Sequence, residues 1–256
     1  GVACTDKVGW GSTFSSPVCP GKESAIEFCK NVYSELIDLF PYKYVHIGGD
    51  EVEKTNWKKC PDCQKRMRDN QLKTEEELQA WFIHNMEKFF NSKGKEMIGW
   101  DELLEGGVTP STIVMSWRGT EGGIKAAKSG NRVIMSPRFY FYLDYYQTKN
   151  PAKEPMTIGG YVPMRKVYEL DPYDQLTPEE RTYILGVQGN LWTEYIATFP
   201  LLKHMLLPRL AAIAEVGWAY DRKDFDDFKH RMNSLRKCYD AAGLNYATYF
   251  FDGRDE

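Results

Sequence analysis

The chain has 256 residues, of which 42% are hydrophobic and 14% aromatic, enough apolar material for a substantial folded core. A net charge of −3 supplies no broad basic surface, so nucleic acid and anionic membranes are not expected as partners. No apolar run approaches the ~18 residues of a membrane-spanning helix, so no membrane span is expected. With no repeat or linker, the sequence predicts one globular domain over residues 1–256.

Helices and short apolar strands alternate along the chain. The spacing of apolar residues predicts the helices, with Pro41 stopping the first and Thr74 as a candidate N-cap of the second. These helices are Glu23–Leu39, Thr74–Phe90, Gly122–Ser129, Pro200–Val216 and Asp224–Ala241. The predicted strands are Tyr44–Ile47, Glu96–Gly99, Thr112–Ser116, Arg132–Met135 and Tyr183–Val187. Residues 150–178, rich in Pro, Gly and Tyr, are expected to form a long functional loop.

This alternation predicts an α/β fold. Strands that are mostly apolar and separated by helices favour parallel pairing, because each crossover helix covers the sheet. In such folds the catalytic and binding residues lie at the C-terminal ends of the strands. Polar and aromatic residues at those positions are therefore the candidates for a functional site.

The most informative segment is His46–Glu51, in which two glycines and two carboxylates follow a strand. An Asp-Glu pair is commonly a solvated loop or the first turn of a helix. Here it follows His-Ile-Gly-Gly instead of a Ser or Thr helix cap, which favours a pocket floor. Asp50 and Glu51 are therefore candidate catalytic acids, whereas His46 is more typical of a satisfied core residue.

Other candidates lie at or just beyond the ends of the later strands. They form four short motifs, namely Trp100-Asp101-Glu102, Ser116-Trp117-Arg118, Tyr142-Leu143-Asp144 and Trp192-Thr193-Glu194. Right-handed crossovers bring the C-terminal ends of parallel strands to one face, so these motifs are expected to converge on one pocket. The ordinary alternatives are core packing for the tryptophans and surface ion pairs for the acids.

Together with His46–Glu51, these motifs resemble glycoside hydrolase family 20, the β-N-acetylhexosaminidases, in order and rough spacing. The resemblance implies a partial (β/α)8 TIM-type barrel that comprises strands 4 to 8 with their helices. The acid pair would follow the fourth strand, and the first twenty-odd residues would be the loop after the third. The chain would then be the C-terminal part of a catalytic domain truncated at its N-terminal side.

The resemblance also implies a reaction. It is exo-acting hydrolysis of terminal GlcNAc or GalNAc β-glycosides with retention, in which the 2-acetamido oxygen of the substrate attacks C1. Glu51 would be the general acid, its pKa raised by a partly apolar pocket and by Asp50. Asp50 would orient the acetamido group, and Tyr142 would donate to its carbonyl oxygen. The substrate-binding residues would be three indoles against the acetamido methyl and two acids at O4 and O6: Trp100, Trp117, Trp192, Asp144 and Glu194.

The resemblance departs from the family pattern at one point. The family binds the sugar with an arginine from the first barrel strand, and no residue of this chain matches it. Five parallel strands cannot close a barrel, so edges are expected at Tyr44–Ile47 and Tyr183–Val187. A second copy of the chain or a missing N-terminal segment would cover them, and residues 1–256 alone are expected to be poorly active or inactive.

Two other functions are compatible with parts of the pattern. A non-catalytic carbohydrate-binding module would explain the aromatic residues but does not require the acid pair. A glycosidase of another family could use two carboxylates, Glu51 with Glu102 or Glu194. Dependence of activity on a 2-acetamido group discriminates between these functions.

Six cysteines permit three disulfides, and Cys60-Pro-Asp-Cys63 is the one closely spaced pair. Without a second such pair or nearby histidines, free or locally bridged thiols are favoured over a long-range disulfide, and a metal site is not expected. No cofactor is expected either. The sequence shows no signal peptide and no Asn-x-Ser/Thr acceptor. With the family resemblance, the lack of such an acceptor favours a bacterial periplasmic, secreted or cell-surface protein.

Overall fold

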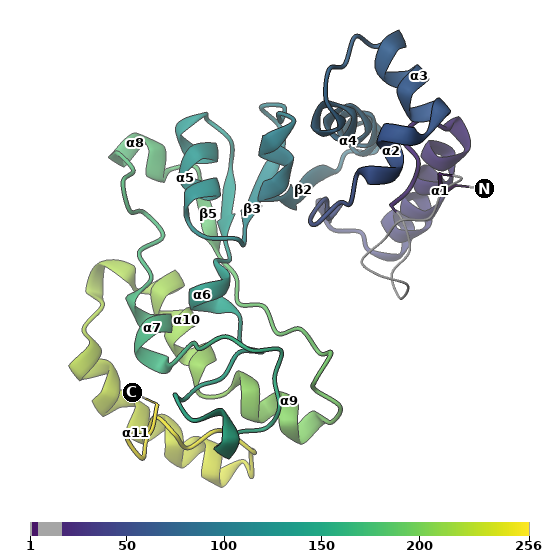
Figure 1. The fold of residues 1–256 in the computed structure, drawn as a ribbon. Helices are drawn as coiled ribbons and strands as arrows, with labels where there is room; N and C mark the ends of the chain where they lie inside the picture. The colour runs from purple at the N-terminus through teal and green to yellow at the C-terminus, as the bar shows by residue number, and fades with distance from the viewer. Residues whose placement is uncertain (1, 5–16, 256) are drawn as a thin grey trace. The chain divides into compact units, whose positions relative to one another are not determined.

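A computed structural model describes residues 2–4 and 17–255 (Figure 1). Its helices alternate with five parallel strands, whose order along the sheet is β1-β2-β3-β4-β5. The strands are β1 Tyr44–His46, β2 Glu96–Trp100, β3 Ile113–Ser116, β4 Val133–Met135 and β5 Ile184–Val187. The α/β class, the five strands and their parallel pairing are as predicted.

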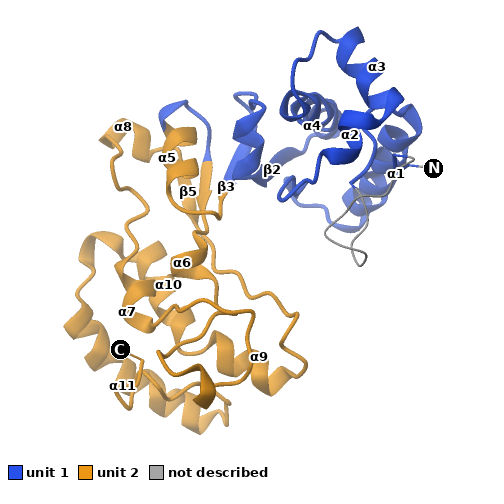
Figure 2. Cartoon of the chain, viewed as in Figure 1, with its two compact units in different colours: residues 1–115, 128–132 blue, residues 116–127, 133–256 orange. Residues whose placement is uncertain are grey.

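The chain divides into two compact units (Figure 2). Unit 1 comprises residues 1–115 and 128–132, and unit 2 comprises residues 116–127 and 133–256. The expectation of one catalytic domain over residues 1–256 stays a prediction.

In unit 1, β2 pairs with β1 and β3, with Val45 opposite Met97 and Ile98 opposite Ile113. The helices are α1 Glu23–Leu39, α2 Thr55–Lys59, α3 Pro61–Asp69 and α4 Glu75–Ser92, with a 3-10 turn at Asp101–Glu105. Thr74 caps α4 as predicted, because its side chain accepts from the Glu77 N–H. One face of α4 packs on Met97 of β2 and Ile26 of α1, which fixes the strand ends relative to these helices.

In unit 2, β4 pairs with β5 with a register shift at Val133/Ile134. The helices are α5 Glu121–Lys128, α6 Arg138–Phe141, α7 Met164–Glu169, α8 Pro178–Arg181, α9 Phe199–Leu206, α10 Arg209–Trp218 and α11 Phe225–Ala241. Short 3-10 turns lie at Pro151–Lys153 and Tyr220–Arg222. Phe141, Val167, Val216 and Phe228 lie in one buried core that joins α6, α7, α10 and α11.

Two secondary-structure predictions were wrong, and four short helices were not predicted. The helix predicted over Pro200–Val216 is two helices, because Pro208 cannot donate a backbone hydrogen bond and α9 ends before it. The loop predicted over residues 150–178 contains α7. The helices that were not predicted are α2, α3, α6 and α8, because segments of four to nine residues carry little periodicity.

The order of the strands places β1 and β5 at the two ends of the sheet, as predicted. On α1, a stripe of apolar side chains with helical spacing is exposed: Phe28, Val32, Leu36 and Leu39. The expectation that a second copy or another segment covers the sheet edges stays a prediction.

Candidate active site

The acid pair of unit 1 follows a turn that glycine alone accommodates without strain. Beyond β1, Gly48 and Gly49 have φ values of 77° and 98°. The Trp100 N–H donates to the Gly48 carbonyl at 3.0 Å, and the Gln79 amide donates to the Gly49 carbonyl at 2.8 Å. Glu51 itself has a φ of 47°, an uncommon conformation for a side-chain-bearing residue. The turn is therefore held at both glycines, and the two acids follow it directly.

One leucine makes this turn continuous with the end of β2. A Cβ added to Gly49 would lie 2.6 Å from a methyl carbon of Leu103, and one added to Gly99 would lie 2.2 Å from the other. Leu103 is 3% exposed in the 3-10 turn that follows β2. Its side chain thus occupies the space that side chains at both glycine positions would need.

Asp50 and Glu51 are both exposed. The expected apolar surroundings of Glu51 are thus not provided by its neighbours in unit 1. Exposure does leave the carboxylates accessible to substrate and water, as general acid–base chemistry requires.

His46 lies beneath the acid pair at the end of β1. The Gly48 N–H donates to its Nδ1 at 3.0 Å, so this nitrogen is an unprotonated acceptor. The ring lies 4.7 Å from that of Trp100, centroid to centroid, at 60°. Burial lowers the pKa of His46, and the charge of Asp50 opposes that effect. His46 thus supports the turn and packs against Trp100. It is not the satisfied core residue expected from the sequence, because its buried Nε2 has no hydrogen-bond partner among the described residues.

Of the other unit 1 candidates, Trp100 is 9% exposed and closes β2. Asp101 is buried and Glu102 half-buried, both in the 3-10 turn that carries Leu103. This turn places Glu102 on a different segment from the exposed Glu51.

Unit 2 brings three of the predicted aromatic residues together. The rings of Trp117 and Tyr142 are stacked, with centroids 6.1 Å apart, and Trp192 lies edge-on to Tyr142 at 6.2 Å. Tyr142 is 6% exposed and Trp192 42%. Burial raises the pKa of the Tyr142 hydroxyl to about 12, although Asn190 and Trp192 partly offset it. The phenol is therefore a neutral hydrogen-bond donor at neutral pH, the form needed to hold an amide carbonyl oxygen.

Asp144 is buried two residues beyond Tyr142. Burial raises its pKa to about 6, opposed by backbone N–H groups and the charge of Arg209 and reinforced by Glu194. Its Oδ1 has no hydrogen-bond partner among the described residues. A buried acceptor without a partner is costly unless a ligand hydroxyl completes it, so Asp144 suits sugar binding.

Arg209, which the sequence analysis did not single out, fixes the segment that carries Asp144. Its fully buried guanidinium donates to the carbonyls of Leu143, Tyr145, Val162 and Met205, the Val162 bond being 2.9 Å. The Leu143 and Tyr145 carbonyls flank Asp144 on either side. One sequence signal could have indicated this role, since Arg209 is the only charged residue between Leu206 and Ala214.

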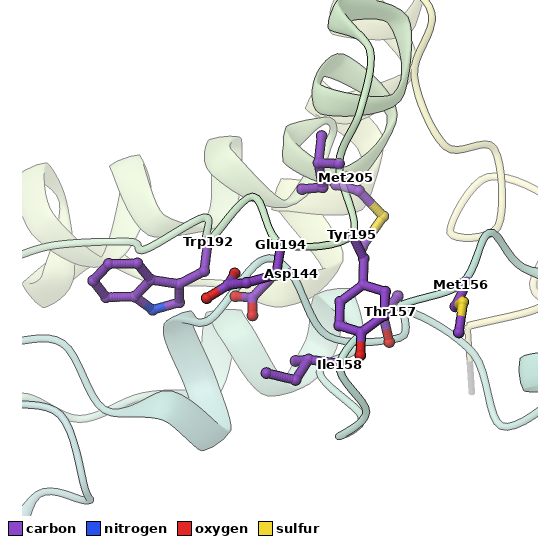
Figure 3. Close-up of a pocket in the computed structure, with 9 residues that line it drawn as sticks. Asp144, Met156, Thr157, Ile158, Trp192, Glu194, Tyr195 and Met205 are labelled. Carbon is purple, nitrogen blue, oxygen red and sulfur yellow. The ribbon is translucent and has the colours of Figure 1, made fainter. Parts of the chain in front are cut away.

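Asp144, Trp192 and Glu194 line a small solvent-open hollow in unit 2 of about 200 Å³ (Figure 3). Figure 3 shows the two carboxylates side by side, with the Trp192 indole to one side of them and Tyr195 to the other. Met156, Thr157, Ile158, Ile196 and Met205 complete the lining. Two hydroxyl-accepting acids beside an aromatic face are a suitable arrangement for a sugar.

The predicted site residues therefore fall into two sets. Asp50, Glu51 and Trp100 belong to unit 1, and the others to unit 2: Trp117, Tyr142, Asp144, Trp192 and Glu194. The structure brings the residues of unit 2 together, whereas the convergence of both sets on one pocket stays a prediction. Arg118 is exposed beside Trp117.

Comparison with known proteins decides the family. The family described as "Glycosyl hydrolase family 20, catalytic domain" matches residues 3–221 of this chain. The chain belongs to glycosyl hydrolase family 20. A beta-hexosaminidase of Porphyromonas gingivalis is 48% identical over 89% of this chain, and the matched region is 30% of that protein.

Solved family 20 structures agree with the fold. An exo β-N-acetylglucosaminidase of Vibrio harveyi, crystallised with N-acetylglucosamine, matches 94% of this chain with a TM-score of 0.82 and 30% identity. An N-acetyl-β-hexosaminidase of Streptomyces plicatus matches 91% with a TM-score of 0.75 and 29% identity. The chain spans 40% and 44% of those two chains, so the five strands form part of a family 20 TIM-type barrel. No described helix is long and apolar enough to cross a membrane.

Proposed function

We propose that the protein containing this chain is an exo-acting β-N-acetylhexosaminidase that hydrolyses terminal GlcNAc or GalNAc β-glycosides with retention. The observation that carries the proposal is the acid pair, held after a turn of two glycines at the end of β1 in a family 20 chain. The named relatives support hexosaminidase activity as the class of reaction.

In the proposed mechanism, Glu51 donates a proton to the glycosidic oxygen while the acetamido oxygen of the substrate attacks C1. The bond to the leaving alcohol breaks, and a cyclic oxazolinium ion forms. Glu51 then takes a proton from water, which attacks C1 and reopens the ring. The exposure of Glu51 supports both proton transfers.

The other residues have binding and orienting roles in this proposal. Asp50 accepts the acetamido N–H and stabilises the cationic intermediate, and Tyr142 donates to the acetamido carbonyl oxygen. The neutral, buried phenol of Tyr142 and its two flanking indoles support its part. Asp144 and Glu194, adjacent in the unit 2 hollow, accept sugar hydroxyls. The indole faces of Trp100, Trp117 and Trp192 pack on the acetamido methyl.

The test compares two substrates with protein made from the complete reading frame. The p-nitrophenyl β-glycoside of N-acetylglucosamine should be hydrolysed, and NMR should show the β-anomer of the sugar as the first product. The matching plain β-glucoside should be cleaved at least ~100-fold more slowly, since it lacks the internal nucleophile.

Two outcomes would overturn the proposal. Equal cleavage of both glycosides would favour a two-carboxylate glycosidase that uses Glu51 with Glu102 or Glu194. Binding of N-acetylglucosamine without turnover of either glycoside would favour a carbohydrate-binding module.

A further inference from the structure

Four buried cysteines of unit 1 gather at one point. They are Cys4, Cys19, Cys60 and Cys63, and their sulfur atoms all lie within 4.8 Å of one another. The Sγ atom of Cys19 lies 3.6 Å from the Sγ of Cys60 and 3.3 Å from the Sγ of Cys63. The Sγ atoms of Cys4 and Cys63 are 3.7 Å apart. The four come from three separate segments of sequence, which is why the spacing of Cys60 and Cys63 alone did not indicate a metal site.

The separations between the sulfurs match a tetrahedral metal site better than disulfides. Sulfurs bound to one zinc ion at about 2.3 Å lie about 3.8 Å from one another, whereas a disulfide brings two sulfurs to about 2.05 Å. Cys19 is close to two other sulfurs at once, and so is Cys63. Disulfides would give each sulfur one partner, whereas a shared ion accounts for four mutual neighbours.

The backbone around the sulfurs is built to bring these segments together. Cys60 ends α2 and precedes Pro61, the first residue of α3, so Cys60 and Cys63 lie on one turn. The segment that follows Cys19 packs directly against this turn, since a Cβ on Gly21 would lie 2.2 Å from the Asp62 carbonyl carbon. On the other side, the Cys19 N–H donates to the Val2 carbonyl at 2.8 Å, which holds the Cys4 segment in place.

The surroundings of the sulfurs favour a closed structural site over a catalytic one. Trp57, Met67 and Leu78 pack against the cysteines, and all four cysteines are at most 5% exposed. A site with four thiolates and no open position binds Zn²⁺ tightly and offers no place for a substrate.

We propose that Cys4, Cys19, Cys60 and Cys63 form a structural tetrathiolate site for Zn²⁺. On binding, each thiol loses its proton to solvent and forms one sulfur–zinc bond, with no change of oxidation state. The ion joins the segments of Cys4 and Cys19 to the α2–α3 turn. That turn begins nine residues after Glu51, so the zinc site anchors the chain that leaves the acid pair.

The first test uses the complete protein, purified without chelators or reducing agents. Elemental analysis should find at least one zinc per chain, and peptide mapping after denaturation with EDTA should find all six cysteines of residues 1–256 modified by a thiol reagent. In an oxidising compartment the same four cysteines could instead form two disulfides. Protein without zinc in which only two of these six cysteines are modified would overturn the proposal, and so would modification of all six without bound zinc.

The second test separates ligands from other cysteines. Cys60→Ser should lose the zinc, whereas Cys238→Ser, at an exposed cysteine on α11, should keep it. If Cys60→Ser does not fold, the wild-type protein exchanged with Co²⁺ still gives an answer. Four thiolates should produce an intense sulfur-to-cobalt charge-transfer absorption in the near ultraviolet, and its absence would contradict the proposed ligand set.

Discussion

The acid pair of unit 1 and the segment of unit 2 that carries Tyr142 and Asp144 are held in position in opposite ways. Asp50 and Glu51 are exposed, and the backbone of the preceding turn fixes their position. That turn consists of two glycines whose carbonyls accept hydrogen bonds. Tyr142 and Asp144 are buried and owe their position to packing and to Arg209. Glu51, the proposed general acid, is thus held by the backbone and stays accessible to water. Tyr142 and Asp144, which we propose bind the sugar, are already desolvated, so a ligand would complete their hydrogen bonds.

The largest effect is expected at Glu51. In the complete enzyme, Glu51→Gln should lower kcat by ~10²–10⁴ for poor leaving groups, because it removes the general acid without disturbing the turn. Aryl glycosides with good leaving groups should lose less. Glu27→Gln, at an exposed acid on α1, is the control and should retain normal kinetics. A wild-type rate for Glu51→Gln on a poor leaving group would remove Glu51 from this role.

Asp50→Asn tests whether the two exposed acids differ in function. The change keeps the shape but removes the charge that stabilises the cationic intermediate, so kcat should fall by ~10²–10³. The loss should be similar for good and poor leaving groups, as measured by a series of aryl glycosides. A loss that instead follows the leaving-group pKa would reverse the assignment of Asp50 and Glu51.

Arg209→Met tests whether the buried guanidinium of Arg209 holds the segment of unit 2 that carries Asp144. Four carbonyls would lose their donor, so the free energy of unfolding should fall by about 2–4 kcal/mol in urea denaturation. The control is Arg222→Met, at an exposed arginine, which should change it by less than about 0.5 kcal/mol. An equal loss in both variants would mean that the carbonyls beside Asp144 do not depend on Arg209.

Asp144 should give the smallest effect and a distinct pH dependence. Because burial raises its pKa in the folded state to about 6, the unfolded chain loses this proton first as pH rises. The Asp144 contribution to stability is therefore present at about pH 4 and lost as pH rises through 6. As pH rises from 4 to 7, the free energy of unfolding of Asp144→Asn should accordingly rise by about 1–2 kcal/mol relative to that of the wild type.

The matched control for Asp144 is an exposed carboxylate with the opposite shift. Lys65 lowers the pKa of Asp69, so that carboxylate contributes stability at higher pH, and this contribution is lost as pH falls. Relative to wild type, Asp69→Asn should thus be less stable at pH 7, and this difference should shrink as pH falls to 4 and below. Parallel pH profiles for the two variants would contradict the burial of Asp144 as the cause.

Much of this arrangement was predictable because strand-end motifs are local in sequence. The segment His46–Glu51 contains both the strand and the glycines that end it, and the five strands were located within a few residues. Interactions between distant segments left no such local pattern. Arg209 binds carbonyls up to 66 residues away, and Cys4 meets Cys63 across 59 residues, so only the fold reveals these groupings.

Leu103 has a consequence for how the family 20 sequence can vary. Because its two methyl carbons fill the space above Gly49 and Gly99, the glycine turn and the end of β2 are one steric unit, although fifty residues separate them. A larger residue at Gly99 becomes tolerable only after position 103 has shrunk, and that first step opens a cavity in the core. At Gly49 the φ of 98° disfavours any side chain even then. Substitutions at positions 99 and 103 should therefore be inherited together, and a library that randomises position 49 or 99 alone should recover almost only glycine.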